Sequence, residues 1–313
     1  MTLDYHRLKA TQFDDLPHRY GADHCILYAL GVGAGLGNDP VLGDEVRYLY
    51  EEKLQALPSM VSVIAYPGFW MRDPVHGIDW RKVVHGEQRI TLHCPLATAG
   101  NVCSLSRVTR ITDKGAHSGA VVVTERKILD QATRQPVAVI EQVNVCRGDG
   151  GYSAGASELS DPPLQPIPRP PERDPDQILT VPTSRNQAAI YRLSGDRNPL
   201  HIDPDSARLS GLPGPILHGA ALAGLATRVL LAQPQPADAF LSRLDIRFTG
   251  VAYPGMAVGV ERWFEPGYVA FRCREAETLR ELAFGRAAWQ QLERKRGGRR
   301  PVSVLHLDRT YSS

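Results

Sequence analysis

The run Tyr191-Arg-Leu-Ser-Gly-Asp196-Arg-Asn198-Pro-Leu-His201 is the stretch that decides how the rest of the chain is interpreted. It places a carboxylate, a carboxamide and an imidazole within six positions, at Asp196, Asn198 and His201. The glycine before Asp196 permits a tight turn, and the proline after Asn198 stops any helix from continuing. A kinked segment can therefore direct all three side chains into one cavity. Because a carboxylate and an imidazole can share a water molecule and move its protons near neutral pH, the run predicts a water-handling site.

A simpler interpretation of the same residues is a turn. Asp-x-Asn-Pro is a good turn sequence, and Asp or Asn often caps a following helix. Capping alone would be the preferred role for Asp196 if His201 and the flanking apolar helices were absent. Since the whole run is present, the chemical interpretation is favoured.

Length and composition indicate an ordinary globular protein. The chain has 313 residues, enough for two domains or one large one, with 42% hydrophobic and 22% charged residues. A formal net charge of +2 gives no case for nucleic acid or a membrane as a general partner. The five cysteines are scattered without CxxC spacing, which predicts reduced thiols and no metal site.

The N-terminus and the apolar segments carry no targeting signal that can be read. Met1-Thr-Leu-Asp-Tyr-His6 lacks a basic region followed by an apolar stretch, so no signal peptide is expected. The longest apolar segment, around 216–232, is too short to span a bilayer. A cytoplasmic protein is therefore predicted.

Residues 151–178 divide the chain, because this stretch is rich in proline and glycine and cannot build a regular element. The predicted organisation is a first domain at 1–150, a linker at 151–178, a second domain at 179–292 and a basic tail at 293–313. The tail is expected to be a solvated extension.

The two halves share a weak internal repeat. The segment His24-Cys-Ile-Leu-Tyr28-Ala-Leu-Gly31 is similar to Gln187-Ala-Ala-Ile-Tyr191-Arg-Leu-Ser194, 163 residues later. Further on, the apolar segment 57–65 takes the place that 216–224 occupies in the second half, which predicts a helix in each. The shared order of elements favours duplicated domains over a chance likeness.

Each half then continues into predicted strands, which are β-branched and partly alternating. They cover residues 89–93, 120–126 and 137–145 in the first half, and 244–249, 258–263, 268–273 and 282–289 in the second. The segment 217–231 is apolar nearly all round, so it is predicted to be a buried helix. A buried helix wrapped by an antiparallel sheet is the hot-dog architecture, an α+β fold.

The run at 191–201, continued to Ala207, resembles the signature of the type-2 (R-specific) enoyl-CoA hydratases of the MaoC-like dehydratase family. Segments 27–34, 48–52 and 84–88 also resemble double-hot-dog hydratases, so the resemblance extends from about 17 to 292. It implies two tandem hot-dog folds packed as a pseudo-dimer. It also implies reversible addition of water to trans-2-enoyl-CoA, giving (3R)-hydroxyacyl-CoA. No metal or redox cofactor is expected, because CoA arrives as part of the substrate.

The expected roles follow from the three requirements of hydration: activating water, protonating C2 and stabilising the thioester oxygen. Asp196 and His201 are assigned the two proton transfers, and Asn198 the orientation of the water or of His201. The resemblance assigns the backbone amide of Gly219 to the oxyanion hole. His218, beside it, is expected to support substrate binding.

The first half carries no acid and no histidine at the matching place after Gly31, so it is expected to bind rather than catalyse. By the resemblance, Glu51 matches a carboxylate that supports activity, although a solvated charge is an equally good interpretation. Four further residues are expected near the cleft between the halves as substrate-binding residues: His85, Gly86, Glu87 and Gln88.

Several alternatives stay open from the sequence. The acyl group could be branched, dicarboxylic, sterol-derived or attached to a carrier protein. A protein of another class, a non-catalytic acyl-thioester binding partner, is disfavoured by the intact Asp196, Asn198 and His201. The basic residues that meet the CoA phosphates are not identified, and a homodimer is expected.

Overall fold

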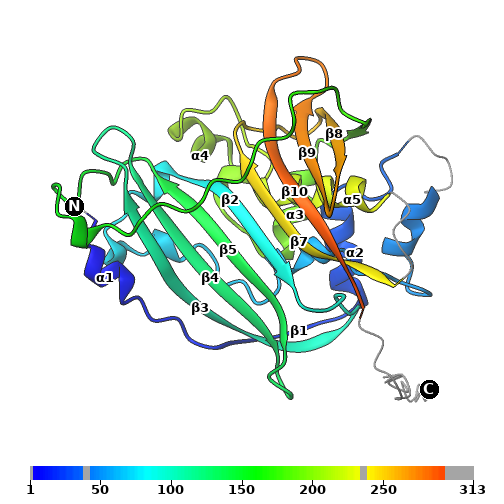
Figure 1. Cartoon of the computed structure of the whole chain (residues 1–313), viewed down its shortest axis with the longest axis horizontal. Helices are drawn as coiled ribbons and strands as arrows, with labels where there is room; N and C mark the ends of the chain where they lie inside the picture. Colours follow the sequence, from blue (N-terminus) through cyan, green and yellow to red (C-terminus); the bar gives the residue numbers. More distant parts are fainter. Residues whose placement is uncertain (1–2, 38–42, 233–237, 293–313) are drawn as a thin grey trace.

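The computed structural model describes residues 3–37, 43–232 and 238–292. Within these ranges ten strands form one antiparallel sheet in the order β1-β3-β4-β5-β2-β7-β10-β9-β8-β6 (Figure 1). The basic tail predicted at 293–313 lies outside the described residues. A double hot-dog is confirmed, because each half contributes five neighbouring strands of this sheet.

The first-half strands are β1 (Leu16–Tyr20), β2 (Val83–Leu92), β3 (Gly100–Asp113), β4 (Ala120–Asp130) and β5 (Pro136–Cys146). The second-half strands are β6 (Gln177–Pro182), β7 (Ala239–Phe248), β8 (Ala257–Glu265), β9 (Tyr268–Glu275) and β10 (Glu281–Gln291). The helices are α1 (Tyr5–Lys9), α2 (Ala22–Gly31), α3 (Gln187–Tyr191), α4 (Pro204–Leu209) and α5 (Gly219–Leu231), with short 3-10 helices between them. Among the described helices, none has the length and apolar character needed to cross a membrane.

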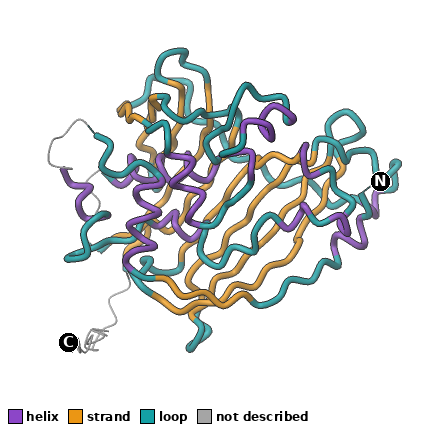
Figure 2. Tube along the Cα trace, turned by 180° about the vertical axis from the view of Figure 1, so that it is seen from behind, coloured by secondary structure: helices purple, strands orange, loops and turns teal. Residues whose placement is uncertain are grey.

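The two half-sheets join edge to edge through β2 and β7. Their pairing runs from Glu87 opposite Arg247 to Thr91 opposite Arg243. Helices α2, α3 and α5 lie together on one face of the continuous sheet, as the view from behind shows (Figure 2). The segment between the halves crosses the opposite face (Figure 1).

The residues of the internal repeat meet each other in space. Helices α2 and α3 pack together, and the rings of Tyr28 and Tyr191, equivalent residues of the two copies, lie 5.8 Å apart between centroids. Both tyrosines are completely buried. Gly31 allows this approach, because a Cβ atom there would lie 2.9 Å from the Cα of Tyr191. The copies are therefore packed as a pseudo-dimer around this contact.

The central helices of the two halves differ. Helix α5 spans 13 residues, and the ten from Ala221 to Leu230 are buried, as its apolar sequence predicts. The expected matching helix at 57–65 is present only as the short 3-10 helix η2 (Pro58–Ser62), so it differs from α5 in both length and type. Pro58 suits only the first turn of a helix, the β-branched valines lower its propensity, and Ala65 has a φ of 47°.

The segment between the halves is held firmly against the sheet. The Asp161 carboxylate accepts hydrogen bonds from Lys9 Nζ (2.6 Å) and from the Ile111 amide (2.7 Å). Farther along, the indole of Trp263 donates to the Arg173 carbonyl at 2.8 Å. The predicted extended linker is thus fixed to the outer face of both half-sheets.

Gly224 sets the distance between the central helix and α2, which gives a test of this packing. A Cβ atom there would overlap Val32 and come within 2.8 Å of the Tyr28 hydroxyl. Gly224→Ala should lower the free energy of unfolding by about 1–3 kcal/mol in urea titrations, although alanine favours helices. Gly214→Ala is the control, because nothing lies within 4 Å of its Cβ position. Equal midpoints for the two variants would contradict the tight helix contact.

Candidate functional site

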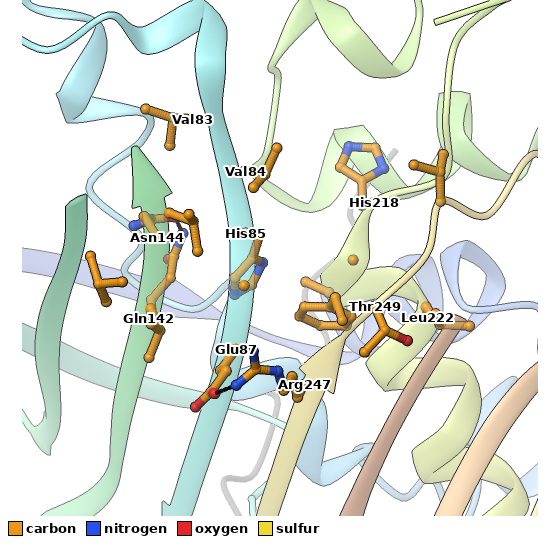
Figure 3. A pocket seen from close by; sticks show the side chains of 18 of the residues that line it. Val83, Val84, His85, Glu87, Gln142, Asn144, His218, Leu222, Arg247 and Thr249 are labelled. Atoms are coloured by element: carbon orange, nitrogen blue, oxygen red, sulfur yellow. Dashed lines mark hydrogen bonds and ion pairs between the residues drawn. The ribbon is translucent and has the colours of Figure 1, made fainter. Parts of the chain in front are cut away.

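A cavity of about 500 Å³ lies between the two halves (Figure 3). The first half contributes β2, β5 and the loop after η2, and the second contributes the 196–201 run, the start of α5 and the end of β7. Eight of the predicted site residues line this cavity: His85, Gly86, Glu87, Asp196, Asn198, His201, His218 and Gly219. Residues far apart in the sequence are thus brought to one place.

The 191–201 run is kinked in the way its sequence predicts. A 3-10 turn follows α3, and Gly195 then adopts a φ of 144°, a region that favours glycine. A second 3-10 turn, Pro199–His201, is capped by the Asn198 side-chain oxygen, which accepts from the Leu200 amide at 3.1 Å. Asp196 Oδ1 accepts from the Asn198 amide at 3.2 Å. The polar side chains therefore also shape the loop that carries them.

His201 is held in one tautomer. Its Nδ1 lies 2.9 Å from the carbonyl oxygen of Ile216. Because a carbonyl can only accept, Nδ1 carries the proton and Nε2 presents a lone pair. Burial lowers the pKa of His201 below its usual value, while the charge of Asp196 and the Ile216 hydrogen bond act in the opposite direction. The ring is therefore a neutral base at neutral pH.

His218 supports the ring of His201 from one side. The two imidazoles are stacked, with centroids 3.5 Å apart and planes inclined by 24°. His218 Nε2 lies 3.2 Å from the backbone oxygen of Asp196, and its ring also contacts Tyr191. Burial, and then the neighbouring His201, lower the pKa of His218 to about 2. It therefore stays neutral and ties the start of α5 to the 196–201 loop.

Asp196, His201 and His218 have their donor atoms within 4.8 Å of one another, so a metal ion has to be considered. Nδ1 of His201 and Nε2 of His218 are already committed to backbone carbonyls. The ring planes are nearly parallel and stacked, so the remaining lone pairs lie in separate, nearly parallel planes, which is unfavourable for binding one metal ion. The arrangement fits a water molecule between a carboxylate and an imidazole better than a metal ion.

The N-terminus of α5 opens onto the same cavity. Gly219 is its first residue, and the cap residue His218 makes no side-chain hydrogen bond to the first turn. The first N–H groups of a helix have no partner within it, and the helix dipole places positive charge there. The ring of Phe248 covers the Gly219 Cα, and a Cβ atom at this position would lie 3.3 Å from the ring. This end of α5 can stabilise a negatively charged oxygen.

A β-bulge in β2 determines which face of the sheet each residue of the His85–Gln88 segment occupies. His85 is opposite Asn144 and Gln88 is opposite Gln142, so Gly86 is the additional residue. His85 and Gln88 consequently share one face of the sheet. A Cβ atom at Gly86 would lie 3.0 Å from the Val145 side chain. Burial lowers the pKa of His85 to about 4, a backbone hydrogen bond with Glu87 opposes this, and its Nε2 has no partner.

Two of the expected binding residues lie off the cavity, and a third, Glu87, lines it but is held in ion pairs. The Glu87 carboxylate forms ion pairs with Arg89 (2.6 Å) on its own strand and with Arg247 (3.0 Å) on β7, and the second pair joins the two halves. Gln88 is buried but does not line the cavity. Glu51 is exposed and also lies off the cavity, which agrees with a solvated charge and not with direct substrate contact.

Sequence reasoning missed several polar residues of the first half that line the cavity, and these include Tyr66, Gln142 and Asn144. Tyr66 follows η2, and the other two lie on β5. The signal was the polar residue at every second position of 142–145, which places both side chains on the face opposite Val143 and Val145.

Comparisons with known proteins cover nearly the whole described chain. Residues 18–148 match the MFE-2 hydratase 2 N-terminal domain family, and residues 166–280 match the MaoC like domain family. The chain is 38% identical to 3-hydroxyacyl-thioester dehydratase Y of Mycobacterium tuberculosis over 80% of its length and 84% of that protein. It is 28% identical to the peroxisomal enoyl-CoA hydratase 2 of Arabidopsis thaliana, over 88% and 93% of the two chains.

A solved structure shows a similarity of fold to the same family. The chain is similar to the crystal structure of a MaoC-like dehydratase from Phytophthora capsici, with a TM-score of 0.76 and 26% sequence identity. The match covers 93% of this chain and 100% of that one.

The buried histidines of the cavity make stability depend on pH. In the unfolded chain His85, His201 and His218 take up protons below a pKa of about 6.5, whereas burial lowers the pKa of each in the folded protein, to about 4 for His85. The unfolded state therefore binds more protons below pH 6.5. Stability should fall as pH is lowered, by about 1.4 kcal/mol per pH unit for each histidine that stays neutral.

Urea titrations between pH 7 and 5 measure this slope. His85→Asn removes one of the three groups and should make the slope shallower by that amount. An identical slope in wild type and variant would mean that His85 is protonated in the folded protein.

Proposed function

We propose that this chain, which belongs to the MaoC-like dehydratase family, is a hydro-lyase that adds water reversibly to trans-2-enoyl-CoA and gives (3R)-hydroxyacyl-CoA. One observation carries the proposal: His201, with Nδ1 fixed on Ile216, presents Nε2 beside Asp196 at the positive end of α5. The names of the relatives, a thioester dehydratase and an enoyl-CoA hydratase, support the same reaction class.

In the proposed mechanism a water molecule lies between the Asp196 carboxylate and His201 Nε2. One O–H bond of the water breaks as its oxygen bonds to C3, and the Asp196–His201 pair, called the dyad below, takes up the proton. The dyad then delivers a proton to C2, so that the elements of one water are added. The loop hydrogen bond of Asn198 to Leu200 keeps these groups at a fixed separation.

The thioester oxygen gains charge as C3 is attacked, and we assign its stabilisation to the Gly219 amide. This amide lies at the N-terminus of a 13-residue helix, where unpaired N–H groups and the helix dipole both favour an anion. His218 acts as a positioning residue, because its ring stacks on His201 and bonds the Asp196 backbone.

The two halves divide the work in this proposal. The domain at 179–292 supplies the reacting groups, and the domain at 1–150, joined through the linker at 151–178, supplies the wall that holds the acyl group. No metal or redox cofactor takes part, and a homodimer remains the expected assembly. The cytoplasmic location also remains a prediction, since one relative is peroxisomal.

The proposal is tested by adding the protein to trans-2-butenoyl-, octenoyl- and dodecenoyl-CoA and following the loss of the conjugated enoyl absorbance. The expected product is the (3R)-hydroxyacyl-CoA, formed at the same rate with and without a chelator. A (3S) product would refute the stereochemical assignment. Loss of activity with the chelator, restored by a metal ion, would refute the metal-free mechanism.

The dyad predicts the effect of two substitutions. Asp196→Asn and His201→Ala should each lower kcat by about 10²–10⁴-fold, because each removes a proton-transfer group. Asp205→Asn is the matched control, since this nearby carboxylate is exposed and pairs with Arg208. Urea midpoints verify that each variant is folded. Near-normal turnover by either dyad variant would show that the assignment is incorrect.

A further inference from the structure

The first-half wall of the cavity includes apolar residues, but part of it is a cluster of polar side chains where a pocket for a plain fatty chain would be apolar. Strand β5 directs Gln142 and Asn144 to this wall, and β2 directs His85 to it (Figure 3). Tyr66 completes it from the loop after η2. These four residues are called the polar wall below.

The register of the sheet makes the wall continuous. Asn144 is opposite His85 on β2, and Gln142 is opposite Gln88 on β2 and Thr124 on β4. Side chains opposite each other in an antiparallel sheet share a face. Two adjacent rows of polar side chains therefore run across neighbouring strands, one with two members and one with three. Such a pattern involves several positions and does not come from a single chance substitution.

The polar groups of the wall are only partly satisfied within the protein. Gln142 Nε2 donates to Asn144 Oδ1 at 3.3 Å, and the Gln142 side chain lies near the Tyr66 hydroxyl. His85 Nε2 is buried and has no hydrogen-bond partner among the described residues. Asn144 is 5% exposed. A buried polar atom left without a partner costs about 1–3 kcal/mol, so whatever fills the cavity must supply partners.

An unsubstituted alkyl chain cannot supply them. It would displace water from the wall and leave His85 Nε2 and the amides of Gln142 and Asn144 facing methylene groups. A chain with an oxygen at the wall replaces the water with an equivalent hydrogen bond. Sites built to bond a polar group discriminate strongly against an analogue that lacks it.

We propose that the acyl group of the substrate carries an oxygen substituent, and that Tyr66, His85, Gln142 and Asn144 bind it. The inference rests on the proposed hydratase function and narrows its substrate class. An enoyl-CoA with a hydroxyl or carboxylate on the acyl chain is then the preferred substrate, and a plain fatty enoyl-CoA is a poor one.

The test compares kcat/KM for three thioesters of equal chain length: trans-2-octenoyl-CoA, its 8-hydroxy derivative and trans-2-octenedioyl-CoA. At least one oxygenated substrate should exceed the plain one by tenfold or more. Gln142→Leu and Asn144→Leu, which keep the side-chain size, should each reduce that ratio at least tenfold. Gln290→Leu is the control, because Gln290 is exposed on β10 away from the cavity, and it should keep the wild-type ratio.

The outcomes separate the inference from the function on which it rests. If the wild-type protein hydrates octenoyl-CoA as well as both oxygenated substrates, the inference is overturned and the hydratase function stands. A preference that survives both leucine substitutions also overturns it, because the wall would then not be the recognition element. If none of the three thioesters nor trans-2-butenoyl-CoA is hydrated, the function fails and the inference fails with it.

Discussion

The pairing of β2 with β7 is the constraint on which the cavity depends. The ladder joins the two half-sheets from Thr91–Arg243 to Glu87–Arg247, and the Glu87–Arg247 ion pair closes its end at 3.0 Å. Beyond that pair the bulge at Gly86 interrupts β2, and the two strands no longer bond to each other. His85 and Phe248, the next residues along, instead face each other with ring centroids 4.9 Å apart. The cavity therefore begins where the ladder stops, which explains why both halves line it.

The duplicated halves are not equivalent, and the structure gives a physical reason for a single reactive centre. Gly33 stands 163 residues before Asp196, the same separation that relates the two copies of the repeat. A Cβ atom at Gly33 would lie 2.9 Å from Arg228 Nη1. Arg228 comes from α5, pairs with Glu45 at 2.7 Å and donates to the Val32 carbonyl at 2.6 Å. In the first half, the place that matches Asp196 is thus occupied by the Arg228 guanidinium, which ties helix α5 to the first half.

Much of this architecture could be predicted from local patterns. The seven predicted strands overlap β2, β4, β5 and β7–β10, because alternation and β-branching are properties of a short window. Strands β1, β3 and β6 were missed. In β3 the buried residues Val102, Ser104 and Thr112 mix apolar and polar types, so the window shows no clean period. The roles of Glu87 and Gln88 depend on a bulge and on a partner strand about 160 residues away, which no local pattern encodes.

The site also shows why one histidine among three is suited to be the base. His218 Nε2 faces the Asp196 carbonyl and its Nδ1 is enclosed without a partner, so it has no open edge. His85 is fully buried, and no carboxylate raises its lowered pKa. Only His201 combines an open Nε2 with the nearby charge of Asp196, which compensates part of the cost of accepting a proton in a buried place. A base that is neutral at rest yet can be charged briefly beside a carboxylate is what reversible hydration requires, because the same ring must release the proton in each direction.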